Sequence, residues 1–341
     1  MMIRTKNPEN ELKEGEFFAK PFLFSYSSLN TLLTAPSAFY AQYVLGKKDD
    51  SFHKHLIEGS VIHYLVLEHQ GFDKKFLITG NLPSPNTIDV VTRIYKDFYV
   101  TSENKEAVLT DFLDEIDDVL SEINLHQAIK DRTKRLEKIT GSGGEEYFEF
   151  LKKRENRIVI DSAVLDVCTE RADIVKANQE IRELLGMDRI SDGRSFGVYN
   201  ELPISKPAEV LGLPFGLKGV LDNVVVDIRN KLIRINDFKT TGKNLIDFKE
   251  SIEFWNYWLQ AIVYENLIKY FFRKFFTKEW KIEIRFIVFD RFNHLYPFEV
   301  SSETLSVWRE RFDKALIEAK YHYETHNFEL PYDFALGKIK L

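Results

Sequence analysis

The fold of this chain is decided by residues 216–242, which read GLKGVLDNVVVDIRNKLIRINDFKTTG. Val and Leu are frequent from 216 to 227, and apolar and polar residues alternate from 232 to 238, which is typical of two β-strands. The connection between them is short and mostly polar, and its Asn230 is a residue type that tolerates a positive φ. The segment therefore predicts a β-hairpin.

A turn centred on residues 229–230 fixes the register of this hairpin. The predicted pairs are Val226 with Ile233, Val224 with Ile235, and Asp222 with Asp237. Because side chains alternate between the two faces of a strand, Asp222 and Asp237 share one face, with Cβ atoms about 4.5–5.5 Å apart. Lys239 follows two residues later and lies on that same face.

Two carboxylates that face each other on a half-buried sheet destabilise it unless positive charge compensates. A divalent cation does so, since hard oxygen ligands on rigid strands suit Mg²⁺ or Mn²⁺. A solvated edge hairpin, with both aspartates in water and Lys239 in a surface salt bridge, explains the spacing equally well. The hairpin alone leaves both interpretations open.

Length and pattern set the expected organisation. The chain has 341 residues, of which 44% are hydrophobic and 29% charged, as in ordinary globular proteins. We expect a flexible N-terminal arm over 1–20 and one domain over 21–341, with a helical half at about 21–190 and a small mixed sheet flanked by helices at about 195–330. Within it, 147–153 reads as a short strand and 247–272 as one long helix.

Composition excludes several classes of protein. The single cysteine, Cys168, excludes a disulfide framework, a cysteine zinc site and a four-cysteine iron–sulfur cluster within one chain, and it favours a reducing compartment such as a bacterial cytoplasm. No apolar run approaches the roughly 20 residues that span a bilayer, and the first residues do not form a signal peptide, so we expect no membrane partner. The formal net charge of −6 argues against nonspecific coating of nucleic acid. The basic cluster at 130–138 is typical of a solvated helix face.

Four further residues carry candidate chemistry. Glu201 lies on a strand predicted over 195–204, just before the hairpin. His63 lies in an apolar helical run over 55–69, where a lone histidine is usually a hydrogen-bonded core residue. Gln260 and Tyr264 are four residues apart on a helix and therefore share one face.

Four motifs in this order resemble the PD-(D/E)XK nuclease superfamily, whose core is restriction-endonuclease-like, and in particular its RecB-like branch. The motifs are Gly59-Ser60-Val61-Ile62-His63, Gly219-Val220-Leu221-Asp222, Asp237-Phe238-Lys239-Thr240-Thr241 and Gln260-Ala261-Ile262-Val263-Tyr264. Ser25-x-Ser27-x-Leu29, Pro36, Tyr40 and the segment 59–76 are most similar to RecE-type exonucleases of phages and prophages. No P-loop motif is present, so the chain looks like a stand-alone nuclease and not a helicase-linked one.

The resemblance implies a metal-dependent exonuclease that hydrolyses phosphodiester bonds of linear, double-stranded DNA in phage-type recombination or DNA processing. It implies Mg²⁺ or Mn²⁺ and no iron–sulfur cluster, and it suggests a homo-oligomeric ring and a single-strand annealing partner protein. The implied site residues are catalytic Asp222, Asp237 and Lys239; metal ligands His63, Asp222, Asp237 and the Phe238 carbonyl, with Glu201 as a ligand or an outer residue; and substrate-binding Gln260 and Tyr264. Two alternatives remain: a catalytically silent DNA-end-binding or scaffold protein on the same fold, and an endonuclease of the same superfamily.

Overall fold

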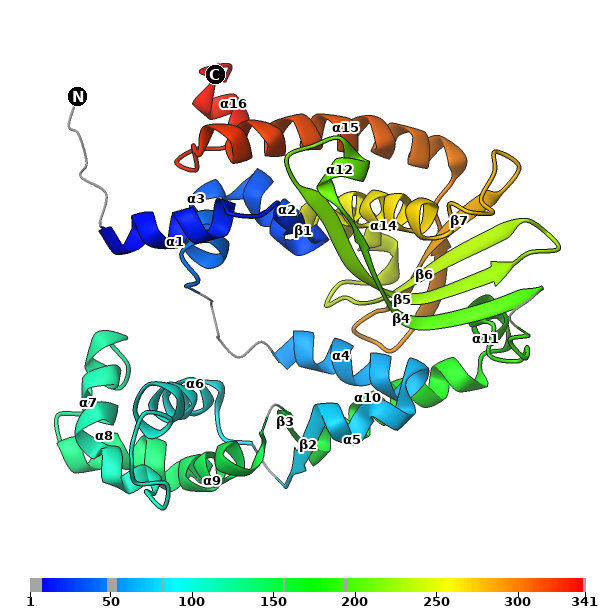
Figure 1. Cartoon of the computed structure of the whole chain (residues 1–341). Coiled ribbons are helices and arrows are strands. Elements are labelled where there is room, and N and C mark those ends of the chain that lie inside the picture. Colours follow the sequence, from blue (N-terminus) through cyan, green and yellow to red (C-terminus); the bar gives the residue numbers. More distant parts are fainter. Residues whose placement is uncertain (1–7, 48–53, 81, 156, 193–194, 340–341) are drawn as a thin grey trace. The chain divides into compact units, whose positions relative to one another are not determined.

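The computed structural model describes residues 8–47, 54–80, 82–155, 157–192 and 195–339. They form two compact units, the first made of Met1–Asp49 with Val175–Leu341 and the second of Asp50–Ile174 (Figure 1). The sequence predicted one domain without a linker. That the two units together work as one nuclease domain stays a prediction.

The first unit is built on a mixed sheet in the order β1-β5-β6-β7-β8, with β4 also paired to β5. Its strands are β1 (Leu23–Phe24), β4 (Phe196–Lys206), β5 (Gly216–Asp227), β6 (Leu232–Thr240), β7 (Lys281–Phe289) and β8 (Leu295–Glu299). On one side of β5, β1 pairs in parallel with residues 216–217 and β6 pairs antiparallel with residues 223–227. On this side, residues 218–222 of β5 pair with neither β1 nor β6. The two strands β5 and β6 therefore separate at residues 218–222, and this separation is called the split.

The predicted hairpin register is confirmed for Val224 with Ile235 and for Val226 with Ile233. The ladder ends at Asn223 with Asn236, so the expected backbone pair of Asp222 with Asp237 is not formed.

In the turn, Lys231, not Asn230, has the positive φ, at 50°. Asn230 instead donates from its backbone and its side chain to Asp227, at 3.2 and 3.1 Å.

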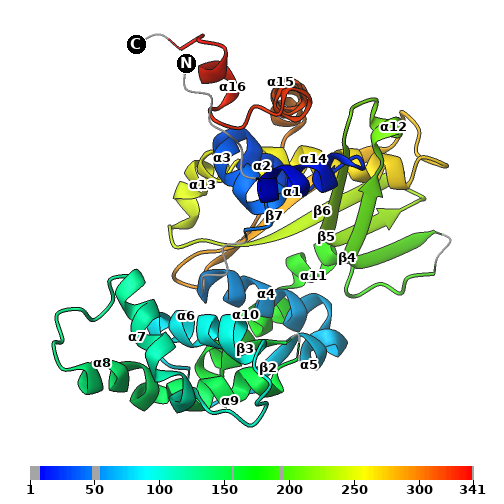
Figure 2. The same cartoon turned by 60° about the vertical axis from the view of Figure 1, so that its left-hand side comes forward.

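Helices cover both faces of this sheet. α14 (Tyr257–Phe271) packs on β4 and β5, and α15 (Ser302–Thr325) and α2 (Tyr26–Thr34) pack on α14 to close the main core (Figures 1 and 2). α11 (Gln179–Leu185) contacts β5 and β6 on the opposite face. The other helices and turns of this unit are α1 (Pro8–Phe18), α3 (Pro36–Phe39), η1 (Tyr40–Val44), α12 (Ala208–Leu211), η6 (Leu245–Asp247), α13 (Phe248–Phe254) and α16 (Tyr332–Ala335).

The long helix predicted over 247–272 is wrong in one respect, because it is broken between α13 and α14. Asn256 has a φ of 54°, which a right-handed helix cannot contain. Its side chain holds the break by donating to Asn30 Oδ1 at 2.8 Å and accepting from Trp258 Nε1 at 2.8 Å. The break lets α14 start in a new direction with Tyr257 at its first turn.

Residues 8–18 also differ from the flexible arm expected over 1–20. They form helix α1, whose Phe17 and Phe18 pack against the main core. Phe18 stacks on His326, with ring centroids 3.9 Å apart. Aromatic burial therefore orders a segment whose polar composition alone suggested an arm; residues 1–7 lie outside the described part of the chain.

The second unit is largely helical and has its own hydrophobic core. Its elements are α4 (Lys54–Leu67), η2 (His69–Gly71), α5 (Phe72–Lys75), β2 (Phe76–Thr79), α6 (Pro85–Ile94), η3 (Tyr95–Tyr99), η4 (Leu109–Phe112), α7 (Leu113–Glu122), α8 (Arg132–Ile139), η5 (Thr140–Gly144), α9 (Glu145–Lys153), β3 (Ile158–Asp161) and most of α10 (Ser162–Ala177). β2 and β3 pair in parallel. The short strand expected at 147–153 is helix α9, because Tyr147, Phe148 and Leu151 fall on one helical face and are buried.

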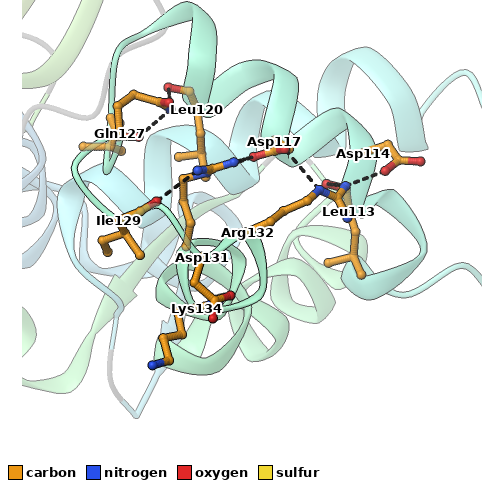
Figure 3. Close-up of polar contacts among 11 residues, drawn as sticks. Leu113, Asp114, Asp117, Leu120, Gln127, Ile129, Asp131, Arg132 and Lys134 are labelled. Carbon is orange, nitrogen blue, oxygen red and sulfur yellow. Dashed lines mark hydrogen bonds and ion pairs between the residues drawn. The ribbon is translucent and has the colours of Figure 1, made fainter.

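The basic cluster at 130–138 is used largely to join two helices of this unit (Figure 3). Arg135 contacts Asp117 at 2.7 Å, and Arg132 contacts the same carboxylate at 3.1 Å and also Asp114. The hydrogen bond from Arg135, supported by Arg132, lowers the pKa of Asp117. The two arginines therefore fasten α8 to α7, an ion-paired contact that the prediction of a solvated helix face did not include.

Candidate active site

A buried chain of hydrogen bonds links α14 to the two strands of the hairpin. Asp237 on β6 is 2% exposed, and its Oδ1 accepts from Gln260 Nε2 at 3.0 Å. The same Nε2 donates to Tyr264 Oη at 2.9 Å, and the Tyr264 hydroxyl donates to the Val220 carbonyl at 2.9 Å. Since both hydrogens of the amide are used on acceptors, this pattern fixes the amide orientation of Gln260. The helix thereby holds β5 and β6 on either side of their split.

Asp222 lies at the split itself. It is 9% exposed, and its Oδ2 accepts from the Phe238 N–H at 2.8 Å. This side-chain contact joins β5 to β6 at the level where the register predicted a backbone pair of Asp222 with Asp237. Phe238 comes between Asp237 and Lys239, so the Asp222 carboxylate is fastened to the centre of the Asp237–Lys239 motif.

Glu201 faces Asp222 from β4. A carboxylate oxygen of Glu201 lies within 4.8 Å of a carboxylate oxygen of Asp222. Among the described residues, the carboxylate of Asp237 does not lie within this distance of both. Glu201 has a φ of 46°, rare for a glutamate inside a strand.

In β5, the alternation of side chains between the two faces of the sheet is interrupted opposite Glu201. Leu217 and Leu221 before this point and Val224 after it all enter the main core, although their positions differ in parity. The side chains of β5 therefore do not alternate regularly through residues 222 and 223, as at a β-bulge.

Lys239 is the cation of the cluster. Its Nζ pairs with Asp237 Oδ2 and lies 4.8 Å from the ring centroid of Tyr257. Burial by itself lowers the pKa of Lys239, but the carboxylates of Asp237 and Asp222 outweigh burial and raise the pKa above its usual value. The two carboxylates therefore favour the charged form of Lys239.

Two tyrosines of the cluster were missed by the sequence analysis. Tyr257 could have been found, because positions 257, 260 and 264 repeat at helical spacing and so share a face with Gln260 and Tyr264. Tyr26 donates its hydroxyl to the Trp255 carbonyl, and its pKa is raised by burial first and then by Tyr257 and Asp237. No sequence pattern joins Tyr26 to the hairpin.

The glycine of the Gly-x-x-Asp motif allows α14 to approach. A Cβ on Gly219 would lie 3.0 Å from Leu267 Cδ1 and 3.1 Å from Tyr264 Cε1, closer than most real contacts. The serine motif near the start is also structural, since Ser25 caps α2 by accepting from the Ser28 N–H at 3.3 Å.

The donor set fits a hard divalent cation. Glu201, Asp222 and Asp237 with Lys239 carry a formal charge of −3 + 1 = −2 when all are ionised, which one divalent ion balances. Carboxylate oxygens are the ligands that Mg²⁺ and Mn²⁺ prefer. His63 lies on α4 of the second unit, and its role as a ligand, like that of the Phe238 carbonyl, stays a prediction.

In the part of the chain that the structure describes, no helix combines the length and apolar character needed to cross a membrane.

The model of the PD-(D/E)XK nuclease superfamily matches residues 23–269. Among solved structures, the chain is similar to a crystal structure of a proposed exonuclease from Eubacterium rectale, with 9% identity and a TM-score of 0.46 over 100% of this chain and 89% of that one. No curated protein matches the chain.

Proposed function

The chain belongs to the PD-(D/E)XK nuclease superfamily and has its fold, a mixed sheet flanked by helices, and on this premise we propose that it is a metal-dependent exonuclease of linear DNA. The observation that carries the proposal is the buried cluster at the split between β5 and β6. There Asp222, Asp237 and Lys239 lie together, and α14 holds Asp237 in place.

Each residue has a role in this proposal. Asp222 and Asp237 would hold the metal ion, His63 and the Phe238 carbonyl would complete its ligands, and Glu201 would act as a further ligand or as an outer residue. A bound Mg²⁺ or Mn²⁺ supplies Lewis acidity and a water of lowered pKa. Lys239 orients the attacking water and offsets the charge that develops on the phosphate oxygens.

Gln260 and Tyr264 have two roles in the proposal. They keep Asp237 oriented through the hydrogen bonds described above, and they hold the backbone of the strand being cut without reading its sequence. The first role is supported by the contacts of Gln260 with Asp237 and Tyr264. The second rests on the resemblance of the Gln-x-x-x-Tyr motif.

The finer parts of the proposal come from the sequence resemblance. They are the RecB-like branch, the RecE-type specificity, a part in phage-type recombination, a ring of identical subunits, a single-strand annealing partner and a place in a bacterial cytoplasm or equivalent reducing compartment. A silent DNA-end-binding or scaffold protein is disfavoured because the Asp, Asp and Lys set is intact.

The test uses purified protein with Mg²⁺ or Mn²⁺ and three substrates: a 5′-labelled linear duplex, a 3′-labelled linear duplex and a closed circle. An exonuclease degrades the linear forms and leaves the circle whole. An endonuclease cuts the circle, and a silent binder cuts none. Asp237→Asn and Lys239→Ala should each abolish cleavage with the fold intact; unchanged cleavage by both variants would refute the assignment.

A further inference from the structure

Three asparagine side chains form a hydrogen-bonded ladder across β4, β5 and β6. Asn200, Asn223 and Asn236 are direct partners in the strand register. Asn223 Nδ2 donates to Asn200 Oδ1 at 2.8 Å, and Asn236 Nδ2 donates to Asn223 Oδ1 at 2.7 Å. The three amides thus connect the three strands side chain to side chain, in addition to the backbone ladder.

Each asparagine is the sequence neighbour of one carboxylate of the candidate site. The sequence neighbours are Asn200–Glu201, Asp222–Asn223 and Asn236–Asp237. Asn236 and Asp237 point to opposite faces of β6, since Asn236 contacts the end of α11 and Asp237 contacts Gln260 on α14. The ladder therefore runs on the α11 face, and each of its amides is one residue along the chain from a carboxylate of the site.

The end of α11 fixes the direction of the ladder. Asn223 Nδ2 also donates to the Leu185 carbonyl at 3.2 Å, and Asn236 Nδ2 to the Leu184 carbonyl at 2.9 Å. These are carbonyls that a helix C-terminus leaves without helical partners. Because both hydrogens of each amide are used, neither side chain can flip without losing two hydrogen bonds. Asn223 and Asn236 are also fully buried, which makes an unsatisfied donor there costly.

The site has a particular need for such support. β5 and β6 separate just past Asn223 and Asn236, and Glu201 holds a left-handed φ of 46° next to Asn200. The backbone ladder between β5 and β6 therefore ends where the carboxylates begin. The amide ladder crosses the sheet at this last paired level and links β4 to the same frame.

We propose that Asn200, Asn223 and Asn236 are positioning residues that set the spacing of Glu201, Asp222 and Asp237 for a divalent cation. This inference rests on the proposed function, since it concerns the metal ligands of that site. Replacement of a residue that hydrogen-bonds to a metal ligand commonly changes metal affinity by about 10–100-fold, and the asparagines would act on the ligands through the backbone of their strands.

The experiment measures Mn²⁺ affinity without DNA, from the electron paramagnetic resonance signal of free Mn²⁺, together with the melting temperature. Asn223→Leu keeps a similar volume and removes the central rung. Asn200→Ala removes the outer rung at an exposed position of β4, so we expect this variant to fold even if Asn223→Leu does not. We expect Mn²⁺ affinity to fall about tenfold or more in Asn223→Leu and less, but measurably, in Asn200→Ala.

Val225→Ala is the matched control. Val225 is buried on the same strand and face as Asn223, against the end of α11, and has no part in the ladder. It should lower the melting temperature and leave Mn²⁺ affinity unchanged. The inference is overturned if the folded ladder variants bind Mn²⁺ as the wild type does, or if Val225→Ala weakens binding equally. If the wild type itself binds no Mn²⁺, the proposed function fails, and this inference with it.

Discussion

Asp222 and Phe238 are joined across the split in the sheet, where the Phe238 N–H donates to the Asp222 carboxylate at 2.8 Å. The Asp222 carboxylate thus has both a structural contact and a proposed role as a metal ligand. A substitution can separate the contact from the metal-binding role, because an amide oxygen accepts from an N–H as a carboxylate does but carries no charge.

Asp222→Asn should therefore keep the fold and lose the chemistry. We expect its melting temperature to stay within a few degrees of the wild type and its metal-dependent DNA cleavage to fall by about 100-fold or more, since a charged metal ligand is lost. Asp222→Ala also removes the carboxylate that accepts from the Phe238 N–H, and it should lower the free energy of unfolding by about a further 1–3 kcal/mol. Melting temperatures and DNA-cleavage rates of the two variants, measured side by side with the wild type, check these expectations. Full activity of Asp222→Asn would exclude Asp222 as a metal ligand.

Gly219→Ala should disturb the site through α14. The added methyl would meet Tyr264 and Leu267 at about the distances where side chains must shift. Overpacking of this kind costs about 1–3 kcal/mol. We expect a lower melting temperature and reduced cleavage, because Tyr264 is displaced from Val220 and Gln260. Gly242→Ala, with open space around its Cβ, is the control and should leave both unchanged.

Tyr264→Phe should show how far the hydrogen-bond chain supports Asp237. The variant leaves the Val220 carbonyl and one hydrogen of Gln260 without their present partners. We expect a loss of about 0.5–1.5 kcal/mol in stability and a fall in kcat at saturating DNA. A change in KM alone would instead assign Tyr264 to DNA binding, as its motif resemblance suggests. Steady-state kinetics with a linear duplex distinguish the two.

The ion pair between Arg309 and Glu265 should make α15 sensitive to acid. Glu265 is 1% exposed and contacts Arg309 at 2.5 Å and Lys269 at 2.9 Å. Burial raises the pKa of Glu265, but Arg309 and Lys269 outweigh it and lower the pKa below its ordinary value. The stabilisation is thus complete above the unfolded-state pKa and is lost as pH falls through the lower folded-state pKa.

Arg309→Ala should lower the free energy of unfolding at pH 7 by about 1–3 kcal/mol, because Glu265 keeps only Lys269. The difference from the wild type should shrink in acid, which urea unfolding at pH 7 and near pH 3 measures. Lys320→Ala, which removes an exposed pair on the same helix, should change little at either pH. A difference that grows in acid would contradict the assignment.

The strands of the site were predictable, because alternating side chains and a short connection leave one register for the hairpin. The end of the backbone ladder before Asp222 and Asp237 was not predictable, since the Asp222 carboxylate accepts from the Phe238 N–H and no spacing rule includes such a contact. The left-handed Glu201 gives no sequence signal, because glutamate rarely adopts that conformation. Asn256 is a residue type that allows such a break, but the apolar run around it indicated a continuous helix. Phe17 and Phe18 order α1 through contacts with residues more than 300 positions away, such as His326.

The pairing of β1 with the start of β5 has a consequence for synthesis of the protein. Leu23 and its partner Gly216 are 216 − 23 = 193 positions apart, and the second unit lies between them in the chain. At about 5–20 residues per second, a ribosome needs roughly 10–40 s to make that interval. The second unit, with its own core, can fold during this delay, while the first residues of the catalytic sheet wait for a partner strand. Slower translation would lengthen the time during which Phe24 and its aromatic neighbours are exposed to chaperones and proteases.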